Sequence, residues 1–147
     1  GAEAASGDWI VFLHADSRLP RGFAAAIENS GARFGGFRIR FAEDDRTLRV
    51  AARMINLRTA MTREPWGDQA QFVRRSAFAG FREMPIMEDY ELARRMRPAR
   101  ILPLYVTTSG RRFLQKGLLR TAATNWLTIV RYHLGADPAE LARAYRR

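Results

Sequence analysis

Two polar side chains that could hold a metal ion, His14 and Asp16, directly follow five apolar residues, Trp9 to Leu13. Such a run is typical of a strand covered on both faces, as in a parallel α/β sheet. Ligands of these sheets bind just beyond the carboxyl ends of the strands. His14 and Asp16 are one residue apart and so lie on one side of an extended chain. They could hold a divalent cation against a phosphorylated substrate, which predicts an enzyme.

Two charged pairs add groups that suit group transfer. Glu88 and Asp89 stand where a helix is predicted to begin, and one carboxylate could take a proton from an attacking hydroxyl. Arg111 and Arg112 follow a glycine turn with hydroxyl side chains nearby, and adjacent guanidinium groups can bind a diphosphate through bidentate contacts. Both pairs also have an ordinary structural interpretation. The acids can stabilise a helix N-terminus, and the arginines can be a solvated pair before a helix.

A loop with an aromatic ring beside polar groups is the remaining candidate, and it consists of Trp66, Gly67, Asp68 and Gln69. The indole can stack on a sugar face, while the carboxylate and the amide can form hydrogen bonds with hydroxyl groups. The alternative is an ordinary Gly-Asp turn with a packed indole. The first pair has a similar alternative, in which Asp16 caps a turn and His14 only ends a strand.

The hydrophobic pattern predicts the elements that must position these groups. Strands are predicted over 9–13, 34–41, 71–74 and 100–107, and helices over 23–27, 47–61, 88–96, 114–134 and after 138. Pro103 predicts an edge position or a bulge in the last strand. The long amphipathic helix has an apolar stripe at steps of four, formed by Leu114, Leu118, Ala122, Trp126, Val130 and Leu134. On the second helix, Leu48, Ala51, Ala52, Ile55 and Met61 lie near one face.

Composition predicts a single domain over 1–147, because 47% of the residues are apolar and the length suits one core. The chain has no cysteine, which excludes disulfides, thiolate metal sites and thiol catalysis. No apolar run approaches the roughly 20 residues that cross a bilayer, so we expect a cytoplasmic protein. The formal charge of +10 favours a polyanionic partner: nucleic acid, anionic lipid or a phosphorylated small molecule.

Four segments occur in one order over nearly the whole chain: His14 to Pro20, Gly67 to Arg75, Met87 to Leu92 and Thr108 to Phe113. Together they resemble the bacterial family 2 glycosyltransferases of the selenodomain- or radical-SAM-associated branch. The resemblance implies an α/β fold of the GT-A type, with a mixed sheet flanked by helices. It also implies an inverting sugar transfer from a nucleotide-diphosphate donor to a sugar or lipid acceptor.

The resemblance also implies roles for the candidate residues. Asp16 matches the last acid of the family's metal-binding DxD motif, with His14 in place of the first, so the implied cofactor is Mn²⁺ or Mg²⁺. Asp89 matches the catalytic base and Glu88 supports it. Arg111-Arg112-Phe113 resembles the arginine-aromatic segment near the diphosphate, without the glutamine of the fuller Gln-x-x-Arg-Trp pattern. Trp66 to Gln69 would lie on the acceptor side.

The chain departs from the family at its beginning, because members start with strands that bind the nucleotide base and ribose. The sequence resembles the C-terminal two-thirds of such an enzyme. We therefore expect either a fragment or a truncated product whose partner supplies the nucleotide pocket. Without those strands an apolar sheet edge would be exposed, which favours self-association.

Two rival interpretations are not enzymatic. A basic module could bind nucleic acid through Arg46, Arg49 and Arg53, but no helix-turn-helix, zinc or RNP-type pattern accompanies them, so no nucleic acid partner is expected. The long helix could instead contact an anionic membrane from the cytoplasmic side, with Trp126 on its apolar face. Its basic residues group on the other face: Lys116, Arg120 and Arg131. The more ordinary alternative is a helix packed on the sheet. Membrane contact is also compatible with a lipid acceptor.

Overall fold

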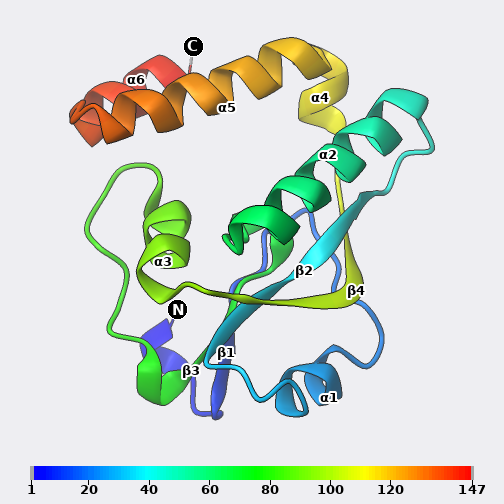
Figure 1. The fold of residues 1–147 in the computed structure, drawn as a ribbon, viewed down its shortest axis with the longest axis vertical. Coiled ribbons are helices and arrows are strands. Elements are labelled where there is room, and N and C mark those ends of the chain that lie inside the picture. The colour runs from blue at the N-terminus through cyan, green and yellow to red at the C-terminus, as the bar shows by residue number, and fades with distance from the viewer. Residues whose placement is uncertain (1, 147) are drawn as a thin grey trace.

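The computed structural model describes residues 2–146 and shows an α/β fold in which helices surround a four-stranded mixed sheet (Figure 1). The strands are β1 (Trp9–Val11), β2 (Phe34–Phe41), β3 (Phe72–Arg74) and β4 (Arg100–Thr108). The helices are α1 (Phe23–Glu28), α2 (Arg46–Thr62), α3 (Glu88–Met96), α4 (Arg111–Lys116), α5 (Leu118–His133) and α6 (Pro138–Arg146). The predicted α/β class, with a mixed sheet and flanking helices, is confirmed.

The topology of the sheet brings several loops to one edge. The strand order is β1-β3-β2-β4, with β3 antiparallel to both of its neighbours and β2 parallel to β4. Strands β1, β2 and β4 therefore run in one direction, and their carboxyl ends lie at the same end of the sheet. Because β3 runs the other way, the loop that precedes it reaches that end of the sheet too. Segments that follow Val11, precede Phe72 and follow Thr108 are neighbours for this reason.

The prediction for β1 was wrong in one respect. The apolar run from Trp9 to Leu13 suggested a strand buried on both faces of a parallel sheet, but β1 pairs only with the antiparallel β3 among the described strands. Ile10 belongs to the core on one side of the sheet, and Trp9 and Val11 pack against the core on the other side, so both faces of β1 are covered as predicted. The neighbour differs because a short apolar run suits a parallel or an antiparallel partner. Leu13 is 43% exposed because it lies beyond the end of β1.

The prediction for Pro103 is confirmed on both counts. Strand β4 lies at the other edge of the sheet, and its pairing with β2 is irregular. Phe37 is opposite Leu102, yet the next residue, Arg38, is opposite Tyr105. The two residues between Leu102 and Tyr105, including Pro103, form the bulge, where the missing N–H of proline costs no ladder hydrogen bond.

The core has two parts, one on each side of the sheet. The first part gathers around α3 and contains Ile10, Phe34, Val73, Leu92, Ala93 and Ala99. The second part gathers around α1 and contains Ile27, Phe37, Ala70, Phe72, Leu102 and Val106. Alternate residues of the short strands, such as Phe72 and Val73, therefore point into different parts. This alternation fixes the register of β3 against both of its neighbours.

Helix α2 is tied to the sheet by polar contacts as well as by apolar packing. Asp45 caps its N-terminus by accepting the N–H of Leu48 at 3.0 Å. The Asn56 side chain exchanges two hydrogen bonds of 2.9 Å with the backbone of Ile39, as a neighbouring strand would. Met61, which we placed on the core face, is instead 76% exposed. Thr59 occupies the buried side, because its hydroxyl finds a buried acceptor there.

The long C-terminal helix predicted over 114–134 is two helices, α4 and α5, and this prediction was wrong. The break is at Gly117, whose φ of 81° lies outside the helical region. The predicted stripe does not face the sheet either, since Trp126 is 58% exposed and Leu134 is 81% exposed. Helix α5 instead packs against α2, α4 and α6 and lies across one end of the molecule (Figure 1). Its buried side includes Thr121, Thr128 and Ile129.

No helix within residues 2–146 is long and apolar enough to cross a membrane.

Candidate active site

A cleft of about 430 Å³ opens at the edge where β1 and β4 end, between the sheet and helices α2 and α5. Its lining includes seven of the residues that the sequence singled out: His14, Asp16, Trp66, Gly67, Asp68, Asp89 and Arg112. The turn that carries Asp16 is held against the end of β4, because Arg18 exchanges two backbone hydrogen bonds with Thr107, of 2.8 and 3.0 Å. The predicted acids near β1 and α3 therefore share one cavity.

His14 and Asp89 converge at Gly67. The backbone N–H of Gly67 donates a hydrogen bond of 2.6 Å to Oδ2 of Asp89. A Cβ atom added at Gly67 would lie 2.7 Å from Nε2 of His14 and 2.9 Å from Oδ2 of Asp89. Only a glycine leaves room for both side chains at this point. The glycine thus sets the position of the imidazole and of the carboxylate.

Asp68 and Arg58 are opposite charges near each other in the wall of the cleft. Asp68 is partly covered, its Oδ1 atom is withdrawn from solvent, and no hydrogen-bond partner reaches that atom among the described residues. Burial raises the pKa of Asp68, and the nearby Asp89 raises it further, while the Arg58 charge opposes both effects. Burial also lowers the pKa of Arg58 to about 10. The pair therefore presents charges that solvent screens only weakly.

Arg58 is a residue that we did not predict as part of the site. Its guanidinium carbon lies 3.4 Å from the ring centroid of Trp66, in a cation–π contact that covers one face of the indole. Its Nε and Nη1 atoms are buried without a partner among the described residues. The sequence indicated that Arg58 faces inward, because it is three residues after Ile55 and seven after Ala51 and so lies on the apolar side of α2.

Gln69 supports the loop and is not accessible to a ligand. It is fully buried, and its Nε2 donates to the Phe37 carbonyl at 3.0 Å. Its Oε1 accepts from the backbone N–H of Trp66 at 3.1 Å and from the Thr59 hydroxyl at 2.8 Å. Both ends of the Gln69 amide are therefore engaged inside the protein, which does not favour the acceptor-binding role expected for Gln69. Trp66 and Asp68 keep their place in the lining.

Of the two predicted charged pairs, Arg111 with Arg112 and Glu88 with Asp89, only one member each lines the cleft. Arg112 lines the cleft and lies 4.2 Å over the Tyr145 ring, which holds the guanidinium in place. Arg111 is exposed, lies outside the lining, and contacts Ser109. Glu88 is exposed and is not in the lining of this cleft, but it lines an adjoining hollow of about 310 Å³ together with His14, Trp66, Asp89 and Arg112. The structure therefore brings one member of each pair, Arg112 and Asp89, into the cleft.

Asp16 and His14 carry the kinds of atoms that can ligate a divalent cation. No group of three or more acidic, histidine or cysteine side chains within residues 2–146 is arranged to hold a metal alone. Mg²⁺, however, is usually bound by one or two carboxylates together with substrate phosphates and water. Asp16 is exposed in the lining of the cleft, and His14 is in the same lining. These two side chains would hold the ion.

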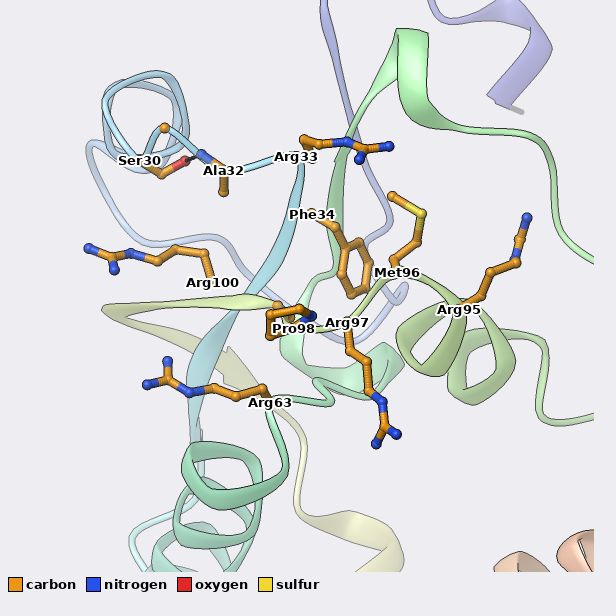
Figure 2. A pocket seen from close by; sticks show the side chains of 12 residues that line it. Ser30, Ala32, Arg33, Phe34, Arg63, Arg95, Met96, Arg97, Pro98 and Arg100 are labelled. Atoms are coloured by element: carbon orange, nitrogen blue, oxygen red, sulfur yellow. Dashed lines mark hydrogen bonds between the residues drawn. The ribbon is translucent and has the colours of Figure 1, made fainter.

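A second hollow, of about 660 Å³, lies at the opposite end of the strands from the cleft, where β2 and β4 begin and α3 ends. Five arginines surround it: Arg33, Arg63, Arg95, Arg97 and Arg100. Their guanidinium groups point outward in different directions, although those of Arg63 and Arg100 extend to one side (Figure 2). Arg97 and Arg95 already pair with Glu64 and Glu91, at 2.7 and 3.4 Å. None of the predicted site residues lines this hollow.

Comparisons with family models, curated proteins and solved structures found no match to this chain.

Proposed function

We propose that the cleft performs a metal-assisted, inverting transfer of a sugar from a nucleotide-diphosphate donor to an acceptor hydroxyl, on a fold of the GT-A type. One observation carries the proposal. Asp16, Asp89 and Arg112 come from distant parts of the chain and line one cavity of about 430 Å³ at the carboxyl edge of the sheet. A carboxylate for a metal, a carboxylate for a proton and a cation for a diphosphate are the groups that this transfer requires.

Asp89 is the proposed general base. Its Oδ2 is held by the Gly67 N–H, so Oδ1 is the atom that takes the proton of the acceptor hydroxyl. The hydroxyl oxygen forms a bond with the anomeric carbon while the bond from that carbon to the donor diphosphate breaks. The nucleoside diphosphate leaves on the side opposite the attack, and the sugar carbon is inverted.

Arg112 is the proposed partner of the leaving diphosphate. Its guanidinium is held over Tyr145, and a planar cation with several donors suits phosphate oxygens. A divalent ion held by Asp16 and His14 would add positive charge to the same leaving group. Arg111, exposed beside Ser109, is not in the lining, and we assign it no share of this role.

The wall formed by Arg58 and Asp68 suits a ligand rich in hydroxyl groups. Arg58 and Asp68 both line the cleft, and two nitrogen atoms of Arg58 and one oxygen atom of Asp68 have no hydrogen-bond partner among residues 2–146. A buried polar group without a partner is costly, and a hydroxyl can serve both kinds of group because it donates and accepts. Trp66 borders this wall and presents indole surface to the same ligand. We place the sugar against this wall.

The experiment is to incubate the protein with Mn²⁺ and a panel of UDP-, GDP- and dTDP-sugars and to measure released nucleoside diphosphate. We expect Asp89→Asn to lower turnover by about 100-fold or more while donor affinity stays within a few-fold. Asp8→Asn is the matched control, because Asp8 is exposed and lies outside the cleft. Turnover of Asp89→Asn within a few-fold of the parent would exclude the role of base.

A second variant tests the metal. Asp16→Ala should weaken donor binding when Mn²⁺ is present and have little effect when a chelator removes the ion. Titration calorimetry with one nucleoside diphosphate, with and without Mn²⁺, measures both affinities. Equal losses of affinity in the two conditions would show that Asp16 does not act through a metal.

The second hollow favours one other candidate function, a basic module that binds nucleic acid. Five arginines around one hollow form a strong positive surface, and Arg63 and Arg100 have no ion-pair partner among the described residues. Fluorescence anisotropy of a labelled single-stranded oligonucleotide over a range of salt concentrations tests this candidate. Binding through the hollow predicts that Arg63→Gln or Arg100→Gln lowers the salt dependence by about one counterion each.

A further inference from the structure

Helices α2 and α5 carry large apolar side chains on their outer faces, which we call the outer apolar face. It consists of Val50, Met54, Leu57, Met61, Leu119, Trp126, Leu127, Val130 and Leu134. Leu119 is 84% exposed, and the others named are exposed as well. On α2 the members are three or four residues apart, and on α5 they recur over the same side of the helix, so each set forms one stripe. A contiguous apolar surface of this kind marks a site of interaction.

The two stripes meet at the mouth of the cleft. Met54 from α2 and Trp126 from α5 both line that cavity, and the two helices are in contact. Whatever covers the outer apolar face therefore also borders the proposed active site. Figure 1 shows α5 across the top of the molecule and α2 running from near it toward the middle, in front of the sheet.

The helical segments that form this face carry charge of one sign. Neither α2 nor the segment 111–133 contains an aspartate or glutamate. Arg46 and Arg53 are exposed beside the α2 stripe, four residues before and three residues after Val50. On α5, Arg120 and Arg131 are seven residues before and four after Leu127, so they lie along the edge of that stripe. The face thus combines apolar side chains with flanking cations.

We propose that the outer apolar face docks on the surface of an anionic lipid bilayer, with the mouth of the cleft turned toward the lipid. Apolar side chains enter the boundary between headgroups and acyl chains, and flanking arginines contact the anionic headgroups. A second copy of the same face would bring cations together without acids to pair with them. Nucleic acid would pair with the arginines but leave the leucines in water. The anionic bilayer is the partner that satisfies both features.

Vesicle binding tests this docking without any turnover, so its result is independent of the proposed transfer. The protein is sedimented with vesicles of phosphatidylcholine alone and with vesicles containing about one-third phosphatidylglycerol. We expect binding to the anionic vesicles that weakens with salt, and at least tenfold weaker binding to the neutral ones. Equal binding to both, or binding to neither, would overturn the proposal.

Substitutions locate the contact. Leu119→Gln and Arg120→Gln should each weaken binding several-fold, and combining Leu57→Gln with Leu119→Gln should abolish it. Tyr105→Gln and Arg21→Gln are the matched controls, because both residues are exposed and outside the face. Circular dichroism checks that each variant is folded. If Leu119→Gln instead dissociates a dimer and leaves vesicle binding intact, the face is an interface between copies and the proposal is wrong.

Tryptophan fluorescence tests the orientation. The chain has three tryptophans, Trp9, Trp66 and Trp126, of which only Trp126 belongs to the outer apolar face. Anionic vesicles should shift the emission to the blue in the parent and in Trp9→Phe. The shift should be lost in Trp126→Phe. A shift that survives in Trp126→Phe would show that another surface meets the lipid.

Discussion

Replacing Gln69 by leucine should destabilise the protein strongly, even though the two side chains have similar volumes. Gln69 is fully buried between α2 and the sheet, in the short 3-10 turn Gly67–Gln69. Its amide joins three parts of the fold: the Phe37 carbonyl in β2, the Thr59 hydroxyl in α2 and the Trp66 N–H in the loop. Leucine would fill the space and satisfy none of them.

The magnitude follows from the groups left without a partner. The Phe37 carbonyl and the Trp66 N–H are backbone groups that cannot turn away, and each costs about 1–3 kcal/mol when buried and unpaired. The Thr59 hydroxyl and the Nη2 group of Arg58, which also donates to Oε1 of Gln69 at 3.0 Å, can relax in part. We expect a loss of about 4 kcal/mol in the free energy of unfolding, out of the 5–15 kcal/mol typical of a domain. For this length of chain, the loss corresponds to a fall of roughly 8–16 °C in Tm.

Urea unfolding, followed by tryptophan fluorescence and circular dichroism, measures the loss. Gln115→Leu is the matched control, because Gln115 is exposed on α4, and it should change the free energy by about 0.5 kcal/mol or less. Thr59→Val removes only one partner of Gln69 and should cost about 1 kcal/mol. A loss below about 1 kcal/mol for Gln69→Leu would refute the argument that this amide holds the loop in place.

Three further predictions concern the cleft and the sheet edge. Gly67→Ala should push aside the ends of His14 and Asp89, so the free energy of unfolding changes by about 1 kcal/mol or less while any turnover falls about 100-fold; unchanged turnover would argue against this geometry. Burial raises the pKa of Asp68 in the folded protein, so the ionised carboxylate destabilises the folded state. This destabilisation is absent below the ordinary pKa of a carboxyl group, because Asp68 is then protonated in the folded and in the unfolded chain. Asp68→Asn should therefore stabilise the protein at neutral pH, with a gain that fades as the pH falls toward 4 in urea titrations; a gain independent of pH would contradict this. Leu13→Lys, two residues after the end of the edge strand β1, should reduce the self-association expected of an exposed apolar sheet edge, as seen by sedimentation velocity, and unchanged association would place the contact elsewhere.

The sequence predicted the elements better than their surroundings. The strands and helices were found near their predicted positions, because alternation and helical spacing are local properties of the chain. Whether the strand that pairs with β1 is parallel or antiparallel to it was not predictable, since a short apolar run fits either kind of neighbour. Met61 and Trp126 were assigned to buried faces because the apolar pattern was assumed to face a core. In the structure they belong to stripes that no part of the described chain covers.

The candidate site shows the same division. Asp16, Asp89 and Arg112 were selected by residue type and by position next to predicted strands and helices. Arg58 escaped notice because its role depends on Trp66, which is eight residues away and in a different element. Gln69 was taken for a surface residue because the number of hydrogen bonds that an amide makes inside a protein is not visible in a loop sequence.

By itself, the amino-acid sequence determined the class of the fold, the chemistry available to the chain and the excess of positive charge. These properties depend on residue type and local spacing. The tertiary structure decided which of those groups meet: β3 runs against its neighbours, so the loop before it reaches the ends of β1 and β4. It also decided which apolar faces remain in water, because Gly117 turns α5 away from the sheet. Contacts between distant segments depend on strand direction and on the packing of whole elements, and local pattern carries neither.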